Sequence, residues 1–348
     1  MAEKGNPNSG MQALKVALRE KMPERLYIFH GEEVFLLHHY LEQLKKCVLD
    51  ELTADFNFHK LTAETFSVRD FADAVEALPM MAERTLVLVD EIDLFKLNEA
   101  DRTGIIDVVS DIPNYCTVVF TYETTPWKPD KRQKKLWEAL DKNGNIVEFP
   151  KQEKRDLVAW IGRHFAAEKK RISSELCVYL IEITGGTMTA LAGEIGKIAA
   201  FSGSDTITKS DIDAVTEPVL DAVVFQMTDM LGQGDYGNAL VKLQQLLKMQ
   251  QEPIAILGAI GGHFRRISAA RILLDSGEQA PELMRLYGMT DFAARRTMGV
   301  AGKFSQSFCR RAAELVLETD NKMKTSFDAP ERLLEVLIVE LAREASHG

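Results

Sequence analysis

Short apolar runs alternate with amphipathic stretches along the first part of the chain. Runs rich in β-branched and aromatic residues predict five strands, over residues 26–30, 56–61, 86–90, 117–121 and 146–149. Apolar positions three and four residues apart predict helices between them, over residues 33–49, 67–78, 103–110 and 133–140. Strands and helices that alternate in this way are joined by right-handed crossovers, which favour a parallel sheet covered on both faces. The pattern therefore predicts an α/β domain with a parallel five-stranded sheet.

The helix predicted over residues 67–78 carries signals at both of its ends. Ser67 and Asp70 have the spacing of a helix-capping pattern. Pro79 disfavours helical geometry at the residue before it and is expected to stop the helix. The next residues, Met80 and Met81, are therefore expected to lie outside the helix.

After Pro150 the strand pattern ends and only helical spacing follows. A first group of helices is predicted over residues 153–169, 174–184 and 188–201, with a short last helix beginning near residue 207. Gly185-Gly186 is the clearest break between them. A second group begins near Glu217-Pro218 and is predicted over residues 221–231, 236–250, 253–274, 281–287, 291–299, 305–324 and 330–345.

These patterns divide the chain into an α/β domain at residues 26–150, a small helical domain at residues 151–216 and a C-terminal helical domain at residues 217–348. Residues 1–25 are expected to form a flexible N-terminal segment. Residues 1–10 are polar, with Gly, Asn, Pro and Ser, and they lack the apolar core of a signal peptide.

Composition is that of an ordinary globular protein, with 46% hydrophobic and 27% charged residues. No apolar run approaches the ~18–20 residues of a membrane span, so we expect no membrane association. The four cysteines have no Cys-x-x-Cys spacing, and we expect reduced thiols and a cytoplasmic location.

The net charge of −10 is unevenly distributed. Residues 260–311 carry nine Lys or Arg against four Asp or Glu, which gives this stretch a local charge of 9 − 4 = +5. We interpret these side chains as solvated helix surfaces held in salt bridges. A surface that meets an acidic subunit or nucleic acid is the alternative.

The turn after the first predicted strand stands where nucleotide-hydrolysing proteins carry a P-loop. That motif, Gly-x-x-x-x-Gly-Lys-[Ser/Thr], wraps phosphates in backbone amides and supplies a lysine and a magnesium-binding hydroxyl. Gly31-Glu32-Glu33 provides one glycine and two carboxylates, without the lysine or the hydroxyl. Since carboxylates repel a triphosphate, the sequence predicts a nucleotide-binding scaffold without its phosphate cradle.

The third predicted strand ends in Asp90-Glu91, as do the strands that hold magnesium and polarise water in ATPases. A water-polarising glutamate works only where phosphate and magnesium are held beside it. We therefore interpret Asp90 and Glu91 as a structural strand end and predict no ATP chemistry. A working but unorthodox nucleotide site built on these two residues is the alternative.

Four segments, in this order, carry a resemblance to a known family: Tyr27-Ile28-Phe29-His30-Gly31-Glu32-Glu33, Leu78-Pro79-Met80-Met81-Ala82-Glu83-Arg84-Thr85-Leu86-Val87-Leu88-Val89, Glu252-Pro253-Ile254-Ala255-Ile256-Leu257 and His263-Phe264-Arg265-Arg266-Ile267. Over residues 26–345 the chain resembles the delta subunit of the bacterial DNA polymerase III clamp loader. The resemblance implies an AAA+-like α/β domain with a decayed nucleotide site, a helical lid domain and a helical collar domain used for oligomerisation.

The resemblance also implies a function. It indicates a non-hydrolysing subunit of the replicative clamp loader that binds the sliding clamp, helps open the ring and loads it on primed DNA. The implied partners are the sliding clamp, the ATPase subunits and a delta-prime-type subunit of the loader, and primer-template DNA within the complex. ATPase and polymerase activities are expected in partner subunits, and no cofactor is expected here. An atypical AAA+ ATPase and a nucleic-acid-binding adaptor are the alternatives.

Met80 and Met81 are the candidate clamp-binding residues. In the family that the chain resembles, an apolar pair at this place inserts into a hydrophobic pocket of the clamp. Methionine is unbranched and polarisable, so it adapts to the groove of a partner. The alternative is that both side chains fill the junction between the preceding helix and the third strand.

Phe327, between the last two predicted helices, is a candidate DNA-proximal residue. The family can place an aromatic residue here near the end of the primer-template, where it can stack on a base. The alternative is that its ring packs beside the start of the last helix.

No metal site is predicted. His38 and His39 are adjacent, and neighbouring residues of a helix point about 100° apart. The remaining histidines lack the ligand spacing of a zinc site.

Overall fold

A computed structural model describes residues 9–130, 132–289 and 291–347 of the chain. The main chain forms two compact units, Met1–Gln152 and Glu153–Gly348. Among the described residues all named strands lie in the first unit, so the prediction of an α/β part followed by an all-α part is confirmed. Within the same residues, no helix combines the length and apolar content needed to cross a bilayer.

The first unit, unit 1, is built on a parallel five-stranded sheet with the strand order β2-β3-β4-β1-β5. The strands are β1 (Leu26–His30), β2 (Phe58–Leu61), β3 (Thr85–Asp90), β4 (Cys116–Tyr122) and β5 (Asn145–Glu148). All five predicted strands are confirmed to within two residues at each end. Every residue of β4 is buried, as expected for a central strand covered on both faces.

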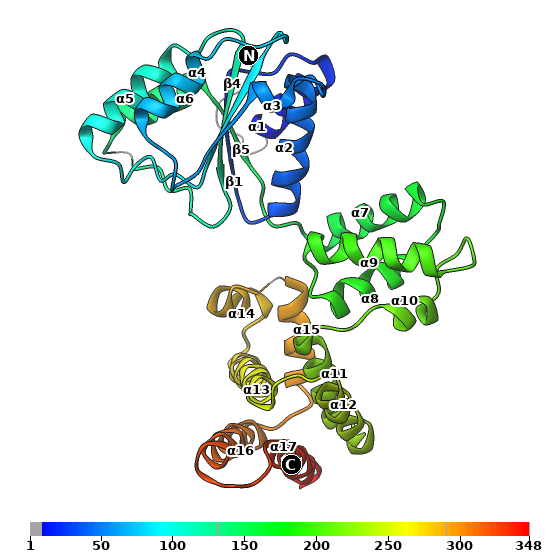
Figure 1. The fold of residues 1–348 in the computed structure, drawn as a ribbon. Coiled ribbons are helices and arrows are strands. Elements are labelled where there is room, and N and C mark those ends of the chain that lie inside the picture. The colour runs from blue at the N-terminus through cyan, green and yellow to red at the C-terminus, as the bar shows by residue number, and fades with distance from the viewer. Residues whose placement is uncertain (1–8, 131, 290, 348) are drawn as a thin grey trace. The chain divides into compact units, whose positions relative to one another are not determined.

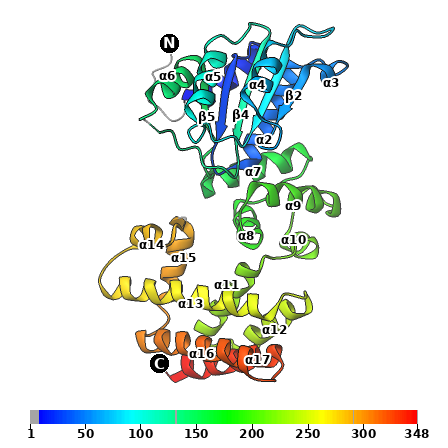
Figure 2. The ribbon, with the colours of Figure 1, turned by 60° about the vertical axis from the view of Figure 1, so that its left-hand side comes forward.

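Helices cover both faces of this sheet (Figures 1 and 2). They are α1 (Ser9–Glu20), α2 (Val34–Val48), α3 (Ala54–Asn57), α4 (Val68–Glu76), α5 (Glu99–Ser110) and α6 (Lys134–Asn143). Alternate strand residues serve two separate cores, because successive side chains of a strand point to opposite faces. Ile28 and Phe120 pack with α4, α5 and α6, whereas Tyr27 and Val119 pack with α1 and α2.

The prediction that residues 1–25 form a flexible segment is wrong for residues 9–20, which form helix α1. Residues 1–8 lie outside the described residues, but Ser9–Glu20 is helical and its Leu14 is fully buried in the core shared with α2. The side-chain amide of Asn145 also donates a hydrogen bond to the carbonyl of Gly10 (3.1 Å). The helix is stabilised by the burial of Leu14 against the sheet. The polar residues at the start of the chain hide this helix in the sequence pattern.

Helix α4 begins as predicted and ends early. The Ser67 hydroxyl accepts a hydrogen bond from the backbone N–H of Asp70 (3.0 Å), which confirms the capping pattern. The helix stops at Glu76, because Ala77 already has a ψ of 123°. Residues 77–84 therefore form a loop, which we call the α4–β3 loop.

The second unit, unit 2, consists of helices in its described residues. They are α7 (Lys154–Ala167), α8 (Ser174–Thr184), α9 (Met188–Phe201), α10 (Lys209–Val215), α11 (Leu220–Gly232), α12 (Tyr236–Lys248), α13 (Pro253–Asp275), α14 (Ala280–Tyr287), α15 (Asp291–Ala301), α16 (Gln306–Thr325) and α17 (Pro330–His347). Gly185 and Gly186 end α8 with left-handed φ angles of 77° and 74°, which confirms the predicted break.

Helices α11 to α17 share one apolar core, to which each of them contributes buried residues. Figure 2 shows α13, α16 and α17 stacked in this part of the unit. The boundaries of the lid and collar domains at residues 151–216 and 217–348 stay predictions.

Candidate functional site

The turn after β1, where a P-loop would stand, lies directly against the end of β5. Gly31 has a φ of 135°, and a Cβ atom added to it would lie 2.3 Å from the carbonyl oxygen of Phe149. The backbone N–H of Glu33 donates to the same oxygen (3.0 Å). The single glycine of the turn is thus required by close main-chain packing.

Glu33 places a largely buried carboxyl group at this turn. Burial raises its pKa above the ordinary range, while a backbone hydrogen bond at Phe35 and the charge of Lys151 act in the opposite direction. An acidic group in this position is the reverse of the lysine that a phosphate-binding turn needs.

Asp90, at the carboxyl end of β3, is engaged by neighbouring strands. The Thr121 hydroxyl donates to one carboxylate oxygen (2.9 Å), and the Lys60 ammonium lies 3.0 Å from the other. Both contacts tie β3 to its neighbours, β4 and β2. The side chain therefore acts as a cross-strand link.

Glu91 caps the loop that follows β4. Its carboxylate accepts the N–H groups of Glu123, Thr124 (3.0 Å) and Thr125 (2.6 Å), and also the Thr124 hydroxyl (2.8 Å). Burial raises the pKa of Glu91, but these hydrogen bonds outweigh it and lower the pKa to about 2. The residue also has a left-handed φ of 63°.

Replacing Glu91 by glutamine should destabilise unit 1 by about 1–3 kcal/mol at pH 7, because charge-assisted hydrogen bonds are lost. The folded-state pKa of about 2 lies below the ordinary value of 4.5, so the ionised carboxylate stabilises the fold above pH 4.5. This contribution should fade as the pH falls from 4.5 towards 2. Urea unfolding of both proteins across this range measures it. Glu32→Gln, at an exposed residue, is the control, and an equally pH-dependent effect there would contradict the prediction.

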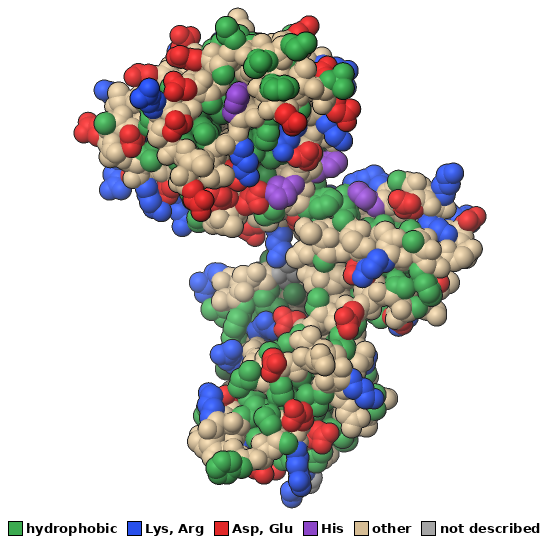
Figure 3. Space-filling model, viewed as in Figure 1, with side chains coloured by type: hydrophobic (Ala, Val, Ile, Leu, Met, Phe, Trp, Pro, Cys, Tyr) green, Lys and Arg blue, Asp and Glu red, His purple; other side chains and the backbone are tan. Residues whose placement is uncertain are grey.

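Met80 and Met81 lie in the α4–β3 loop, with 56% and 94% of their surfaces exposed. Leu78 before them is also exposed. The junction between α4 and β3 is thus not filled by the two methionine side chains, in contrast to the alternative drawn from the sequence. Figure 3 shows hydrophobic side chains exposed at the top of unit 1. Exposed apolar side chains of this size are suited to contact with a partner.

Phe327 lies between α16 and α17, and its side chain is fully exposed. It does not pack against the start of α17. A free aromatic face of this kind is available for stacking.

Ion pairs account for most of the basic side chains in residues 260–311. Arg271, Arg285, Arg295, Arg296, Lys303 and Arg311 each lie within 4.0 Å of a carboxylate oxygen. The interpretation of this region as ion-paired helix surfaces is confirmed for these residues.

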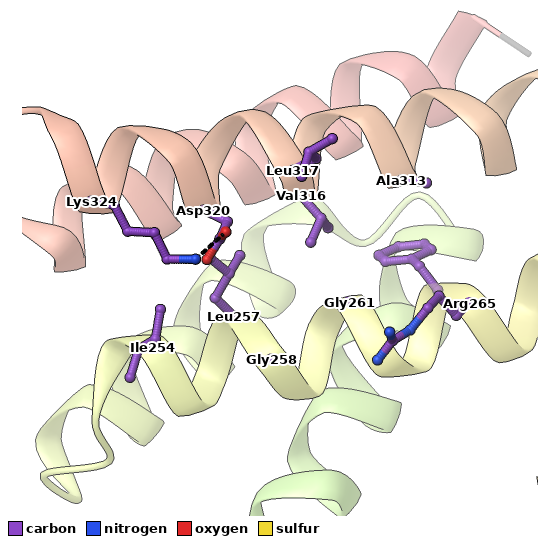
Figure 4. A pocket seen from close by; sticks show the side chains of 11 residues that line it. Ile254, Leu257, Gly258, Gly261, Arg265, Ala313, Val316, Leu317, Asp320 and Lys324 are labelled. Carbon is purple, nitrogen blue, oxygen red and sulfur yellow. Dashed lines mark hydrogen bonds and ion pairs between the residues drawn. The ribbon is translucent and has the colours of Figure 1, made fainter.

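An apolar groove between α13 and α16, with a volume of about 550 Å³, was not predicted (Figure 4). Its walls include Ile254, Leu257 and Leu317, and the ion pair of Asp320 with Lys324 lies at one end. Gly258 leaves room in the groove, since a Cβ atom added there would meet no atom within 4 Å. The groove is formed by two helices that are separate in the chain, so neither helix alone indicates it in the sequence.

The described residues contain no group of three or more His, Cys, Asp or Glu placed to hold a metal ion. His38 contacts Glu123, whereas His39 contacts Gln43 (2.7 Å). The two neighbouring histidines thus have separate partners.

Comparison with known proteins places the chain in a family. A family model described as "DNA polymerase III, delta subunit" matches residues 27–150, and one described as "DNA polymerase III delta subunit, C-terminal domain" matches residues 221–341. Together the two matches cover more than half of the chain.

Individual relatives agree with these matches. The DNA polymerase III subunit delta of Bacillus subtilis is 24% identical over 323 residues, which are 91% of this chain and 93% of that protein. The probable DNA polymerase III subunit delta of Aquifex aeolicus is 22% identical, with 76% of each chain covered.

The fold is also that of a solved relative. The structure of the Bacillus subtilis DNA clamp loader delta protein (YqeN) matches with a TM-score of 0.69 at 22% identity, over 95% of this chain and 99% of that one. The AAA+-like fold predicted from the sequence is therefore confirmed. With both family models and these relatives in agreement, the chain belongs to the DNA polymerase III delta subunit family.

Proposed function

We propose that this chain is the clamp-loader subunit that binds the ring-shaped sliding clamp, helps open it and loads it on primed DNA. The observation that carries the proposal is the exposure of Met80 and Met81 on the α4–β3 loop of a delta-family fold. Two unbranched apolar side chains that project from a folded unit match a hydrophobic pocket on a partner. For a member of this family, we propose that this partner is the sliding clamp.

The subunit works without hydrolysing nucleotide in this proposal. The carboxylates of Asp90 and Glu91 are bound by Lys60, Thr121 and the loop after β4. The turn at Gly31 packs on the main chain of Phe149, which directly follows β5. ATPase activity would then belong to partner subunits. Micromolar ATP affinity of the isolated chain would favour the alternative of an atypical AAA+ ATPase.

Helices α11 to α17 are proposed to form the collar that joins neighbouring loader subunits, including ATPase subunits and a delta-prime-type subunit. The groove between α13 and α16 supports this, since Ile254 and Leu317 leave apolar surface exposed at its walls. The acidic net charge and the ion-paired arginines argue against a free-standing DNA-binding adaptor.

The direct test is to mix the purified chain with the sliding clamp encoded by the same genome and to determine the mass of the product by light scattering. We expect a stable complex in the absence of nucleotide and of the other subunits. A folded chain that forms no complex at micromolar concentrations would contradict clamp binding by the isolated subunit.

Phe327 is proposed to stack on a base near the end of the primer-template in the assembled loader. Loss of one stacked base costs about 1–3 kcal/mol, so Phe327→Ala should weaken primer-template binding by about 5- to 150-fold. Clamp binding by the isolated chain should not change. Phe201→Ala, which removes another exposed ring, is the control. Unchanged primer-template affinity of the Phe327 variant would remove the proposal.

A further inference from the structure

Two segments lie side by side at the amino-terminal ends of the sheet strands. Helix α3 runs directly into β2, and the α4–β3 loop runs directly into β3. Strands β2 and β3 are parallel neighbours, with Phe58 paired to Leu86. The residues before these strands are therefore held side by side at the same edge.

Asn57, the last residue of α3, joins the two segments. Its side chain is fully buried, and its Oδ1 accepts the backbone N–H of Met80 (2.7 Å). Its Nδ2 donates to the carbonyl of Met80 (2.9 Å) and to the carbonyl of Thr53 (2.9 Å). One amide thus satisfies both main-chain polar groups of a residue 23 positions away.

The residue after this contact has an unusual backbone. Met81 adopts a left-handed φ of 53°, and its side chain is the more exposed of the pair. Such a conformation is costly for a residue other than glycine and persists where the surroundings hold it. Residues 77–84 contain no helix or strand, so the bonds of Asn57 to Met80 supply a fixed point in the loop.

We propose that Asn57 is a positioning residue, which holds the α4–β3 loop in the conformation that presents Met80 and Met81 to the sliding clamp. This inference rests on the proposed clamp contact of the two methionines. Without the side-chain amide, the loop would occupy the binding conformation for only a fraction of the time. The apparent dissociation constant rises by the inverse of that fraction.

If Asn57 only stabilised helix α3, this role would explain only one of its three hydrogen bonds. The bond to Thr53 lies within the α3 turn, but the two bonds to Met80 reach a different segment. A side chain that served only to close α3 would have no need of them.

The test uses Asn57→Ala in the full chain, with clamp affinity and amide hydrogen exchange as measurements. We expect affinity for the sliding clamp to fall about tenfold, with faster exchange confined to residues 53–57 and 77–84. Asn57→Asp keeps the acceptor for the Met80 N–H but turns a carboxylate oxygen towards the carbonyls of Met80 and Thr53, so it should also weaken clamp binding. Val109→Ala, which removes core packing in α5, is the control and should lower the melting temperature without weakening clamp binding.

The same measurements in a Met80→Ala/Met81→Ala background separate the two proposals. Asn57→Ala should have no further effect on affinity there, because its influence passes through the methionines. Normal clamp binding by the double methionine variant would overturn the proposed clamp contact. If that variant loses binding while Asn57→Ala exchanges quickly and binds normally, the positioning role is overturned. Unchanged amide hydrogen exchange in Asn57→Ala would also overturn the positioning role. If Asn57→Ala does not fold, the same two measurements on Asn57→Asp decide between these outcomes.

Discussion

Replacing Met80 and Met81 together by alanine should weaken binding of the sliding clamp by about 100-fold or more. Burial of each methionine side chain is worth ~1.5–3 kcal/mol, and 1.4 kcal/mol corresponds to a factor of ten. Both side chains are largely exposed in the free chain, so their removal leaves no cavity in the core. The melting temperature is therefore expected to stay nearly constant.

Calorimetric titration of the clamp, together with thermal unfolding of the chain, measures both quantities. Met22→Ala is a matched control, because it removes another exposed methionine from the same unit. Clamp binding that survives the double substitution would show that the contact lies elsewhere. Loss of binding that accompanies unfolding would leave the two methionines with a structural role, contrary to their exposure.

Gly31→Ala should destabilise unit 1 by about 3 kcal/mol or more. The φ of 135° at this position belongs to a region that is essentially restricted to glycine and costs other residues of order 1–3 kcal/mol. In addition, the new methyl group would lie 2.3 Å from the carbonyl oxygen of Phe149, where no flexible side chain can give way. The turn and the end of β5 would have to separate.

Chemical denaturation measures this loss, followed by the fluorescence of Trp127 and Trp137 in unit 1 and of Trp160 in α7 of unit 2. Gly162→Ala in α7 provides the contrast, since a Cβ atom there meets nothing within 4 Å. That substitution should be neutral or stabilising by up to about 1 kcal/mol. Equal stabilities of the two variants would contradict the close packing at Gly31.

The elements with strong local signals were predictable from the sequence. The five strands and most helices follow from apolar periodicity, and Ser67 and Gly185 mark ends that depend on neighbouring residues only. Helix α1 was missed because it is stabilised by burial of Leu14 in the core and by packing beside β5, a strand distant in the sequence. Helix α3 was missed because a single turn has no periodicity to detect.

The site was predictable in part for the same reason. The missing lysine and hydroxyl at Gly31 and the place of Met80 after a helix can be found in the sequence. The hydrogen-bond partners of Glu91 and Asn57 cannot be found in the sequence, because each contact joins segments that only the folded sheet brings together. Exposure of Met81 is likewise a property of the folded loop.

Helix α1 has a consequence for any shortened form of the protein. β5 is the last strand of the sheet, and α1 lies beside it, with Gly10 close to the main chain of Ile146. An uncovered edge strand exposes unpaired backbone N–H and C=O groups, which can pair with another extended chain and lead to aggregation. A version that begins at Leu26 would keep all five strands but lack α1 beside β5, so we expect it to self-associate more readily than the chain that retains α1.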